Sequence, residues 1–228
     1  SLARLPLRES VKREQPVMKI ISILFLLFAL TACQTAFIAD LVTQSGQALY
    51  HDDFSDPTDG WPEATDTTGS LGYLQGAYRI IVDSAGYDLW AVSRQLYGDV
   101  QVEVDTARLA GTPDNRFGLI CRYQDAENFY VFIISSDGYY ATAIIQNGTS
   151  ALLGQEMMAY NAAIIHGDGP NHIRFDCIGN TLTGYVNGQL VAVASDSNFS
   201  SGDAGLLAGA FDEGGVEISF DNFQVIKP

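Results

Sequence analysis

The sequence predicts an all-β protein in which two antiparallel sheets pack face to face. Short apolar runs separated by turn residues recur from Tyr50 to the end of the chain, and they amount to about twelve strands. Between Val42 and Pro228, no stretch of ten or more residues has the apolar spacing of an amphipathic helix. Several strands are apolar on both faces, which favours one two-layer domain over residues 50–228.

The clearest strand covers residues 99–110, with the sequence DVQVEVDTARLA. Three valines alternate there with Gln101, Glu103 and Asp105. Because successive side chains of a strand point to opposite faces, this alternation predicts a half-buried strand with one polar face.

Four dipeptides predict hairpin turns between the later strands. Asn-Gly and Asp-Gly supply the positive φ angles that two-residue hairpin loops need, and Gly-Asn is used in the same way. The four are Asp137-Gly138, Asn147-Gly148, Gly179-Asn180 and Asn187-Gly188. Together they predict a meander of antiparallel strands.

The N-terminal region has the features of an export signal. Met18 and Lys19 give a positive start, and residues 20–30 (IISILFLLFAL) form an apolar run broken only by Ser22. Such a run rises about 16 Å as a helix, too little for a hydrocarbon core of about 30 Å. The pattern predicts a secretory signal peptide over residues 18–32.

The four residues Leu30-Thr31-Ala32-Cys33 resemble the lipobox of bacterial lipoproteins. In that family the cysteine thiol is acylated, the peptide is cut before it, and the new amino terminus is lipidated. The resemblance implies an extracytoplasmic lipoprotein at the outer membrane or cell surface, with residues 33–49 as lipidated cysteine and tether. The alternatives are an ordinary signal peptide with an incidental cysteine, or an uncut signal anchor. Residues 1–17 are interpreted as an over-extension upstream of a start at Met18.

The net charge of the chain limits the kinds of partner that it can bind. Five of the 12 Lys and Arg residues and two of the 27 Asp and Glu residues precede Cys33, which leaves seven bases, 25 acids and a net charge of −18. Nucleic-acid binding depends on Lys and Arg displacing counterions from phosphates, so this composition excludes nucleic acid as partner. Anionic lipid headgroups are also unfavourable, which leaves the lipid anchor as the expected membrane contact.

Two cysteines lie within the predicted domain. Cys121 and Cys177 each stand in the middle of an expected strand. After export the compartment is oxidising, so a disulfide between them is favoured. The alternative is that they are two small buried apolar residues at separate places.

Four segments of the domain carry a family resemblance. They read YHDDFSDPTDGW, FGLICRYQDAENFYVF, NTLTGYVNGQLV and VEISFDNFQV, in that order along the chain. They resemble the concanavalin A-like jelly roll, and more narrowly the laminin-G-like and 3-keto-disaccharide-hydrolase-like domains of bacterial surface proteins. The resemblance implies a jelly-roll sandwich, with a glycan or another cell-envelope component as partner. It does not separate lectins, carbohydrate-binding modules and glycosidases, which share the fold.

The same resemblance implies a structural calcium ion between the first and last strands. Asp52, Asp53 and Asp221 stand at the matching places, and carboxylates in loops are ligands that Ca²⁺ prefers. The alternative is that these acids cap turns. Chain termini of a domain commonly lie close together, so both strands are also expected to seal one core with three aromatic residues, Phe54, Phe220 and Phe223.

Aromatic residues and one arginine give the remaining signal for a binding site. Sugar rings stack their C–H faces on Trp and Tyr, whereas Arg, Asn and Asp bond to the hydroxyl groups. Trp90, Arg122, Tyr130 and Tyr140 lie on central strands, where the concave sheet of a jelly roll would present them. Arg122 inside an apolar strand needs an acidic partner or a ligand, and Glu103 is one candidate partner. For each aromatic residue the alternative is a place in the core.

Glu103 and Asp105 are the acids to weigh as a catalytic pair. Two residues apart on one strand face, their Cα atoms are about 6.6 Å apart, within reach of the carboxyl separation of a retaining glycosidase. Their spacing matches the start of the laminarinase signature Glu-x-Asp-x-x-Glu, but Arg108 stands where the third acid is required. They are therefore interpreted as solvent-facing acids, and no catalytic residue is predicted.

Three hypotheses for function remain. The first is a lipid-anchored, non-catalytic β-sandwich that binds a glycan or another surface component. The second is a glycoside-cleaving enzyme that resembles the 3-keto-disaccharide hydrolases. The third is a structural lipoprotein without a small ligand.

Overall fold

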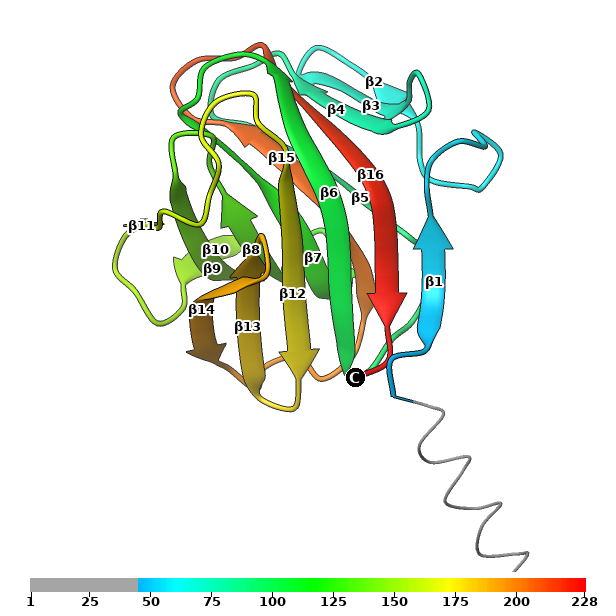
Figure 1. Cartoon of the computed structure of the whole chain (residues 1–228), viewed down its shortest axis with the longest axis vertical. Coiled ribbons are helices and arrows are strands. Elements are labelled where there is room, and N and C mark those ends of the chain that lie inside the picture. Colours follow the sequence, from blue (N-terminus) through cyan, green and yellow to red (C-terminus); the bar gives the residue numbers. More distant parts are fainter. Residues whose placement is uncertain (1–44) are drawn as a thin grey trace, which may run out of the picture. The chain divides into compact units, whose positions relative to one another are not determined.

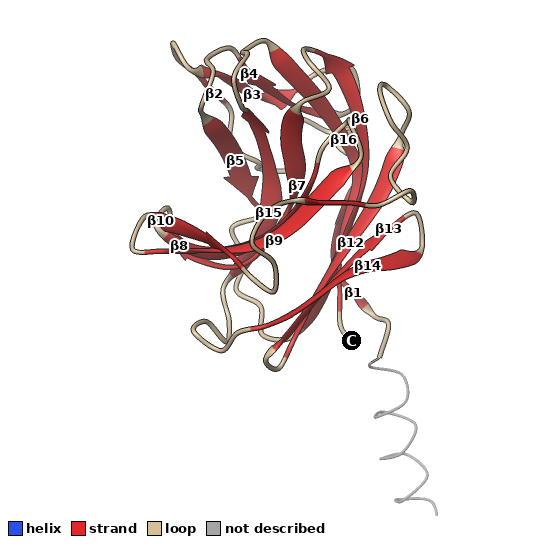
Figure 2. Cartoon of the chain, turned by 90° about the vertical axis from the view of Figure 1, so that its left-hand side faces the viewer, coloured by secondary structure: helices blue, strands red, loops and turns tan. Residues whose placement is uncertain are grey.

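Two antiparallel β-sheets make up the part of the chain that the computed structural model describes, residues 45–228. Figure 2 shows the two sheets stacked face to face, as the sequence predicts. Residues 46–228 form one compact unit that contains both sheets and the core between them. A unit with its own complete core has what a domain needs to fold by itself.

Nine strands form the first sheet, here called sheet A: β1 (Ala48–Asp52), β2 (Ala64–Thr65), β3 (Gly69–Tyr73), β4 (Tyr78–Val82), β6 (Val100–Ala110), β12 (Asn171–Ile178), β13 (Thr181–Val186), β14 (Gln189–Ser195) and β16 (Val216–Ile226). Their order is β14-β13-β12-β6-β16-β4-β3-β2, with β1 paired to β16. Along one edge of β16, its first half pairs with β4 and its second half with β1.

Seven strands form the second sheet, here called sheet B: β5 (Asp88–Val92), β7 (Asn115–Asp125), β8 (Asn128–Ile134), β9 (Tyr139–Gln146), β10 (Thr149–Leu152), β11 (Ala159–Tyr160) and β15 (Asp203–Ala210). Their order is β10-β9-β8-β7-β15-β5, with β11 paired to β9.

The described residues contain 16 strands, so the estimate of about twelve is too low. Two of the additional strands, β2 and β11, have two residues each. A strand that short cannot carry an alternating apolar pattern, which is the signal used to find strands in a sequence.

The four predicted hairpin turns are confirmed. They join β8 to β9, β9 to β10, β12 to β13 and β13 to β14. Asn147 and Gly148 have φ angles of 50° and 72°, and Asn187 and Gly188 have φ angles of 50° and 76°. These left-handed conformations are the ones that Asn and Gly adopt most readily.

The first and last strands are neighbours, as predicted. Figure 1 shows β1 beside the end of β16, and Asp52 lies opposite Phe223 in this pair. The aromatic residues of both strand regions are buried in one core, with exposed fractions of 1% for Phe54 and 0% for Phe220 and Phe223. Trp61 packs against Phe54 and Phe223, with ring centroids 5.3 and 5.0 Å away.

The predicted disulfide is confirmed, and it connects the two sheets. Cys121 on β7 is bonded to Cys177 on β12, and both residues are completely buried. The bridge closes a sequence separation of 56 residues. It therefore ties sheet B to sheet A at the level of the core.

The predictions for residues 1–17, the signal peptide 18–32 and Cys33 lie outside the described residues. Over residues 45–228, no helix has the length and apolar character needed to cross a membrane.

Candidate functional site

The outer face of sheet B is apolar, although it does not face the core. Along β8, side chains alternate between two separate clusters. Tyr130, Phe132 and Ile134 belong to the core between the sheets. The outward residues belong to a second cluster, which consists of Ile120, Phe129, Val131, Ile133, Ala141, Ala143 and Leu207. Sheet B thus buries apolar side chains on both of its faces.

This second cluster forms the floor of a groove with a cavity volume of about 470 Å³. Val131, Ile133, Ala143 and Leu207 line the groove. The same cavity includes Trp90 of β5 and Met158, which lies in the segment after β10. A half-open cavity with an apolar floor is the usual form of a small-molecule binding site.

Aromatic side chains gather at one side of the groove. The ring centroid of Phe129 lies 5.8 Å from that of Trp90 and 5.5 Å from that of Tyr123. The three rings come from three different strands, and tilted contacts at these distances are favourable. Trp90 and Phe129 line the groove and give it an aromatic wall, and Tyr123 packs against Phe129.

One charged pair lines the groove as well. Arg116 of β7 donates from Nε to a carboxylate oxygen of Asp88 on β5. The guanidinium carbon lies 4.4 Å from the ring centroid of Phe211, in a cation–π contact. This pair brings polar atoms to a surface that is otherwise mainly apolar.

A second hollow, of about 600 Å³, adjoins the groove and shares Met158 and Phe211 with it. Its lining includes three carboxylates from three different loops: Asp114, Asp137 and Asp212. The potential at this end of the groove is therefore negative.

The five residues predicted to contact a ligand do not form one site. Trp90 lines the groove of sheet B. Glu103 lies on the outer face of sheet A, whereas Arg122 and Tyr130 are 2% and 0% exposed in the interior. Tyr140 packs against the core from its edge. Of the five, only Trp90 lies where a ligand in the groove would meet it.

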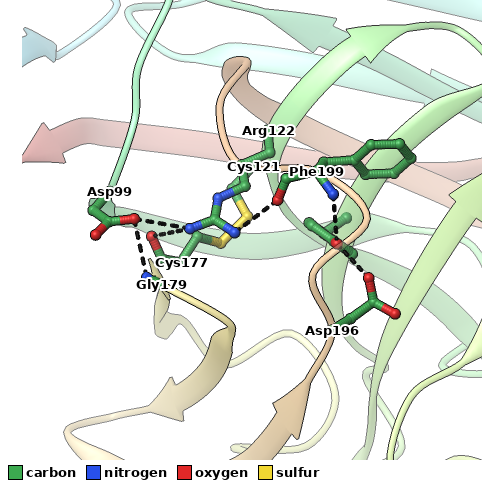
Figure 3. Close-up of a disulfide and its surroundings, with 8 residues drawn as sticks. Asp99, Cys121, Arg122, Cys177, Gly179, Asp196 and Phe199 are labelled. Carbon is green, nitrogen blue, oxygen red and sulfur yellow. Dashed lines mark hydrogen bonds and ion pairs between the residues drawn. A yellow bond between two sulfur atoms is a disulfide. The ribbon is translucent and has the colours of Figure 1, made fainter.

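Arg122 is a structural residue that fixes the end of the sandwich next to the disulfide (Figure 3). It donates to the carbonyl oxygens of Phe199 and Cys177 at 2.8 and 3.2 Å, and it pairs with Asp99 at 2.9 Å. The acidic partner of Arg122 is therefore Asp99, and the candidate pairing with Glu103 is wrong. Arg122 has a φ of 52° at an irregularity of the β7 ladder, which turns its side chain inward against the strand alternation.

Tyr130 is a core residue with a polar end. Its hydroxyl donates to Asp196 and accepts the backbone N–H of Phe199 at 3.0 Å. Burial, together with the hydrogen bond to the Asp196 carboxylate, raises the pKa of Tyr130 to about 12. The hydroxyl is occupied by the protein and is not directed into the groove.

Glu103 and Asp105 lie on the outer face of sheet A, on the other side of the molecule's core from the groove. His172 is 2.8 Å from Asp105 and 3.7 Å from Glu103, and Arg174 is 3.8 Å from Glu103. Asn222 donates to Asp105 at 2.9 Å. The two acids are part of a polar network on a solvated strand face.

The three aspartates of the predicted calcium site each bond to nearby groups. Asp52 accepts the N–H of Phe54 at 2.7 Å, Asp53 accepts that of Ser55, and Asp221 accepts that of Asn222. Within residues 45–228, no group of three or more His, Cys, Asp or Glu side chains is arranged to hold a metal ion. Calcium binding stays a prediction, and no such cluster within residues 45–228 supports it.

Comparison with known proteins places this arrangement in a class of folds. No family model matches the sequence, and no curated protein sequence matches it. Solved structures are similar to it, and their fold is that of concanavalin A-like and galectin-like β-sandwiches.

Three of these structures illustrate the likeness. The carbohydrate-binding module CBM66 from Bacillus subtilis has a TM-score of 0.59 and 20% identity, over 74% of this chain and 96% of that chain. A Bacillus subtilis protein of unknown function with a galectin-like fold has a TM-score of 0.57 and 10% identity, over 80% and 97%. The β-glucanase of Bacillus licheniformis has a TM-score of 0.57 and 14% identity, over 81% and 100%. At these identities the likeness shows the fold.

Sequence reasoning missed most of the residues that line the groove. Phe129 and Val131, which line the groove, are the sequence neighbours of the predicted residue Tyr130. The available signal was the alternation of β8, but both of its faces are apolar, so the alternation does not tell which face lies inside. Asp88 and Arg116 are 28 residues apart and become partners only through β15, which lies between their strands.

Proposed function

We propose that the described domain is a non-catalytic glycan-binding module, held outside the cytoplasmic membrane by a lipidated Cys33. The observation that carries the binding function is the groove of sheet B, which combines an aromatic wall, an apolar floor and one charged pair.

The groove offers contacts for both kinds of group on a sugar ring. A pyranose or furanose has C–H groups that pack on apolar and aromatic surfaces and hydroxyl groups that need hydrogen-bond partners. Trp90 and Phe129 offer the first kind of contact, and Asp88 and Arg116 the second. A volume of about 470 Å³ falls within the usual range for ligand sites. One structural neighbour is a carbohydrate-binding module, which supports the same function.

The carboxylates support binding rather than catalysis. Glycoside hydrolysis generally uses two carboxyl groups on either side of the scissile bond. Among the described residues that line the groove, Asp88 is the one carboxylate, and it is paired with Arg116. Glu103 and Asp105 belong to the opposite sheet. A glycoside-cleaving enzyme is the alternative, because solved structures similar to this chain include the β-glucanase. Product analysis after incubation with ordinary and keto-disaccharides should show no cleavage.

A glycan array with the 46–228 unit tests the binding function. Trp90→Ala should weaken binding about ten-fold or more, because removing a central aromatic contact commonly costs at least 1–2 kcal/mol. Tyr185→Ala is the control, since Tyr185 covers Arg174 on sheet A, away from the groove. If the unmodified unit binds no glycan, the proposal is wrong and the structural role gains support.

Anchoring is tested separately through Cys33. In a bacterial host that makes lipoproteins, Cys33→Ser should abolish incorporation of labelled fatty acid and release the protein from membranes. Labelling that persists in the Cys33→Ser protein would contradict the lipobox assignment.

A further inference from the structure

We propose that Asp88 and Arg116 form hydrogen bonds with two adjacent hydroxyl groups of a sugar ligand. The groove then selects an uncharged sugar over an acidic one. This inference rests on the proposed function, since it names the chemistry that the same groove recognises.

Asp88 and Arg116 meet across a glycine, a position without a side chain. Gly209 of β15 lies opposite both Asp88 on β5 and Arg116 on β7. A Cβ atom at this position would overlap a carboxylate oxygen of Asp88 and would lie 2.7 Å from Arg116 Nε. The absence of a side chain at Gly209 thus lets the two side chains meet across β15.

The pair keeps polar atoms available for a ligand. Arg116 uses Nε for Asp88, and its two terminal nitrogens have no hydrogen bond to another residue of the described part of the chain. The same holds for the second carboxylate oxygen of Asp88. The side chains are 15% and 36% exposed, and the stack on Phe211 fixes the guanidinium plane. Donors and an acceptor therefore stand side by side at the groove.

This combination matches a vicinal diol. One hydroxyl can accept from a terminal nitrogen of Arg116, and its neighbour can donate to the second carboxylate oxygen of Asp88. Hydrogen bonds to charged groups are the stronger ones, so such a pair can orient a ring whose C–H face packs on Trp90.

The charges disfavour an acidic sugar. The positive charge of Arg116 is already compensated by Asp88. The adjoining hollow contributes the carboxylates of Asp114, Asp137 and Asp212, and no Lys or Arg among residues 45–228 lines it. A uronate or another acidic sugar would meet net repulsion there, whereas a neutral sugar would not.

The test uses the 46–228 unit against arrayed neutral gluco-, xylo-, galacto- and fructo-oligosaccharides and against uronate oligosaccharides. The unmodified unit should bind a neutral oligosaccharide at least ten-fold more tightly than any uronate. Asp88→Asn and Arg116→Lys should each weaken that binding about 10- to 100-fold, the usual effect of losing hydrogen bonds to charged groups.

A third variant and a matched control keep the test independent of folding. Gly209→Ala retains both charged side chains but separates them, and it should also weaken binding about ten-fold or more. The control is Arg79→Lys, because Arg79 and Glu217 form a similar pair at 2.6 Å, with 16% and 23% exposure, on sheet A. This control should change affinity less than about two-fold.

The outcomes separate the inference from the proposed function. Glycan binding that is unchanged in the Asp88, Arg116 and Gly209 variants would overturn the inference and leave the binding function standing. If the unmodified unit prefers a uronate, the inference is likewise overturned and the binding function still stands. If no oligosaccharide binds at all, the inference and the proposed function both fall.

Discussion

The outer faces of the two sheets carry opposite chemistry. On sheet A, the outward side chains of Glu103, His172 and Arg174 form a network of polar and charged contacts. On sheet B, the outward side chains of Phe129 and Leu207 belong to an apolar cluster. A sheet with one solvated face ordinarily places polar residues on that face, as sheet A does.

The difference indicates that the apolar face of sheet B serves something other than the sandwich itself. The core between the sheets is complete without this second cluster. Part of this cluster lines a cavity of about 470 Å³, and an apolar cavity with a few polar groups is the usual form of a ligand site. The groove is therefore the part of the molecule where function is to be sought, and sheet A serves as an internal reference.

The largest expected effect is a loss of folding stability, and it differs between two neighbouring leucines of β15. Leu206 faces the sealed core and Leu207 faces the groove, with exposed fractions of 0% and 4%. Leu206→Ala should lower the free energy of unfolding by about 3 kcal/mol or more, because it leaves a closed cavity. Leu207→Ala should cost about 1–2 kcal/mol, since the space that it leaves opens to the groove.

Urea unfolding of both variants checks this comparison. Equal losses for Leu206→Ala and Leu207→Ala would mean that the outer cluster is a second sealed core. In that case the groove would not be a site that a ligand can enter.

A smaller effect on stability is expected at Tyr130, which β8 directs into the core and which follows the groove residue Phe129 in the sequence. The pKa of Tyr130 is raised to about 12 by burial and by its bond to Asp196, above the usual value near 10. Between these values the folded protein retains a proton that the unfolded chain releases. Stability from Tyr130 is therefore complete below about pH 10 and is lost as the pH rises toward 12.

Tyr130→Phe should reduce the free energy of unfolding by about 1–2 kcal/mol at neutral pH, because two hydrogen bonds are lost. It should also make the decline above pH 10 less steep. Some decline will remain, since burial also raises the pKa of Tyr50 and of Tyr78. Melting curves from pH 7 to 11.5 that have the same slope in both proteins would contradict this role of Tyr130.

The smallest effect is expected on the reference face. Glu103→Gln and Asp105→Asn should each change stability by less than about 0.5 kcal/mol, because exposed ion pairs contribute little. Neither should alter glycan binding. A loss of binding or of a product-forming activity in these two variants would move the functional site to sheet A.

Much of the fold could be predicted from the sequence, because its signals are local. The Asn-Gly turns and the alternation of Val100, Val102 and Val104 are read within a few residues, and the structure follows them. The disulfide between Cys121 and Cys177 followed from the number of cysteines and the expected compartment.

The site could be predicted only in part, because its signals are not local. Trp90, which was predicted from its residue type, lines the groove, but Asp88 and Arg116 meet only because Gly209 lies between them in the sheet. Arg122 was misplaced because a positive φ reverses the direction that alternation assigns to it. Strands that are apolar on both faces, such as β8, do not reveal which side is the core.

The most direct test of the account is a ¹⁵N NMR titration of the 46–228 unit with the neutral oligosaccharide that binds most tightly on the array. The account predicts that amide shifts change along β5, β7, β8 and β15, around Trp90, Arg116, Phe129 and Gly209, while those of β6, β12 and β13 stay constant. Shift changes concentrated around Glu103, His172 and Arg174 on sheet A would contradict it.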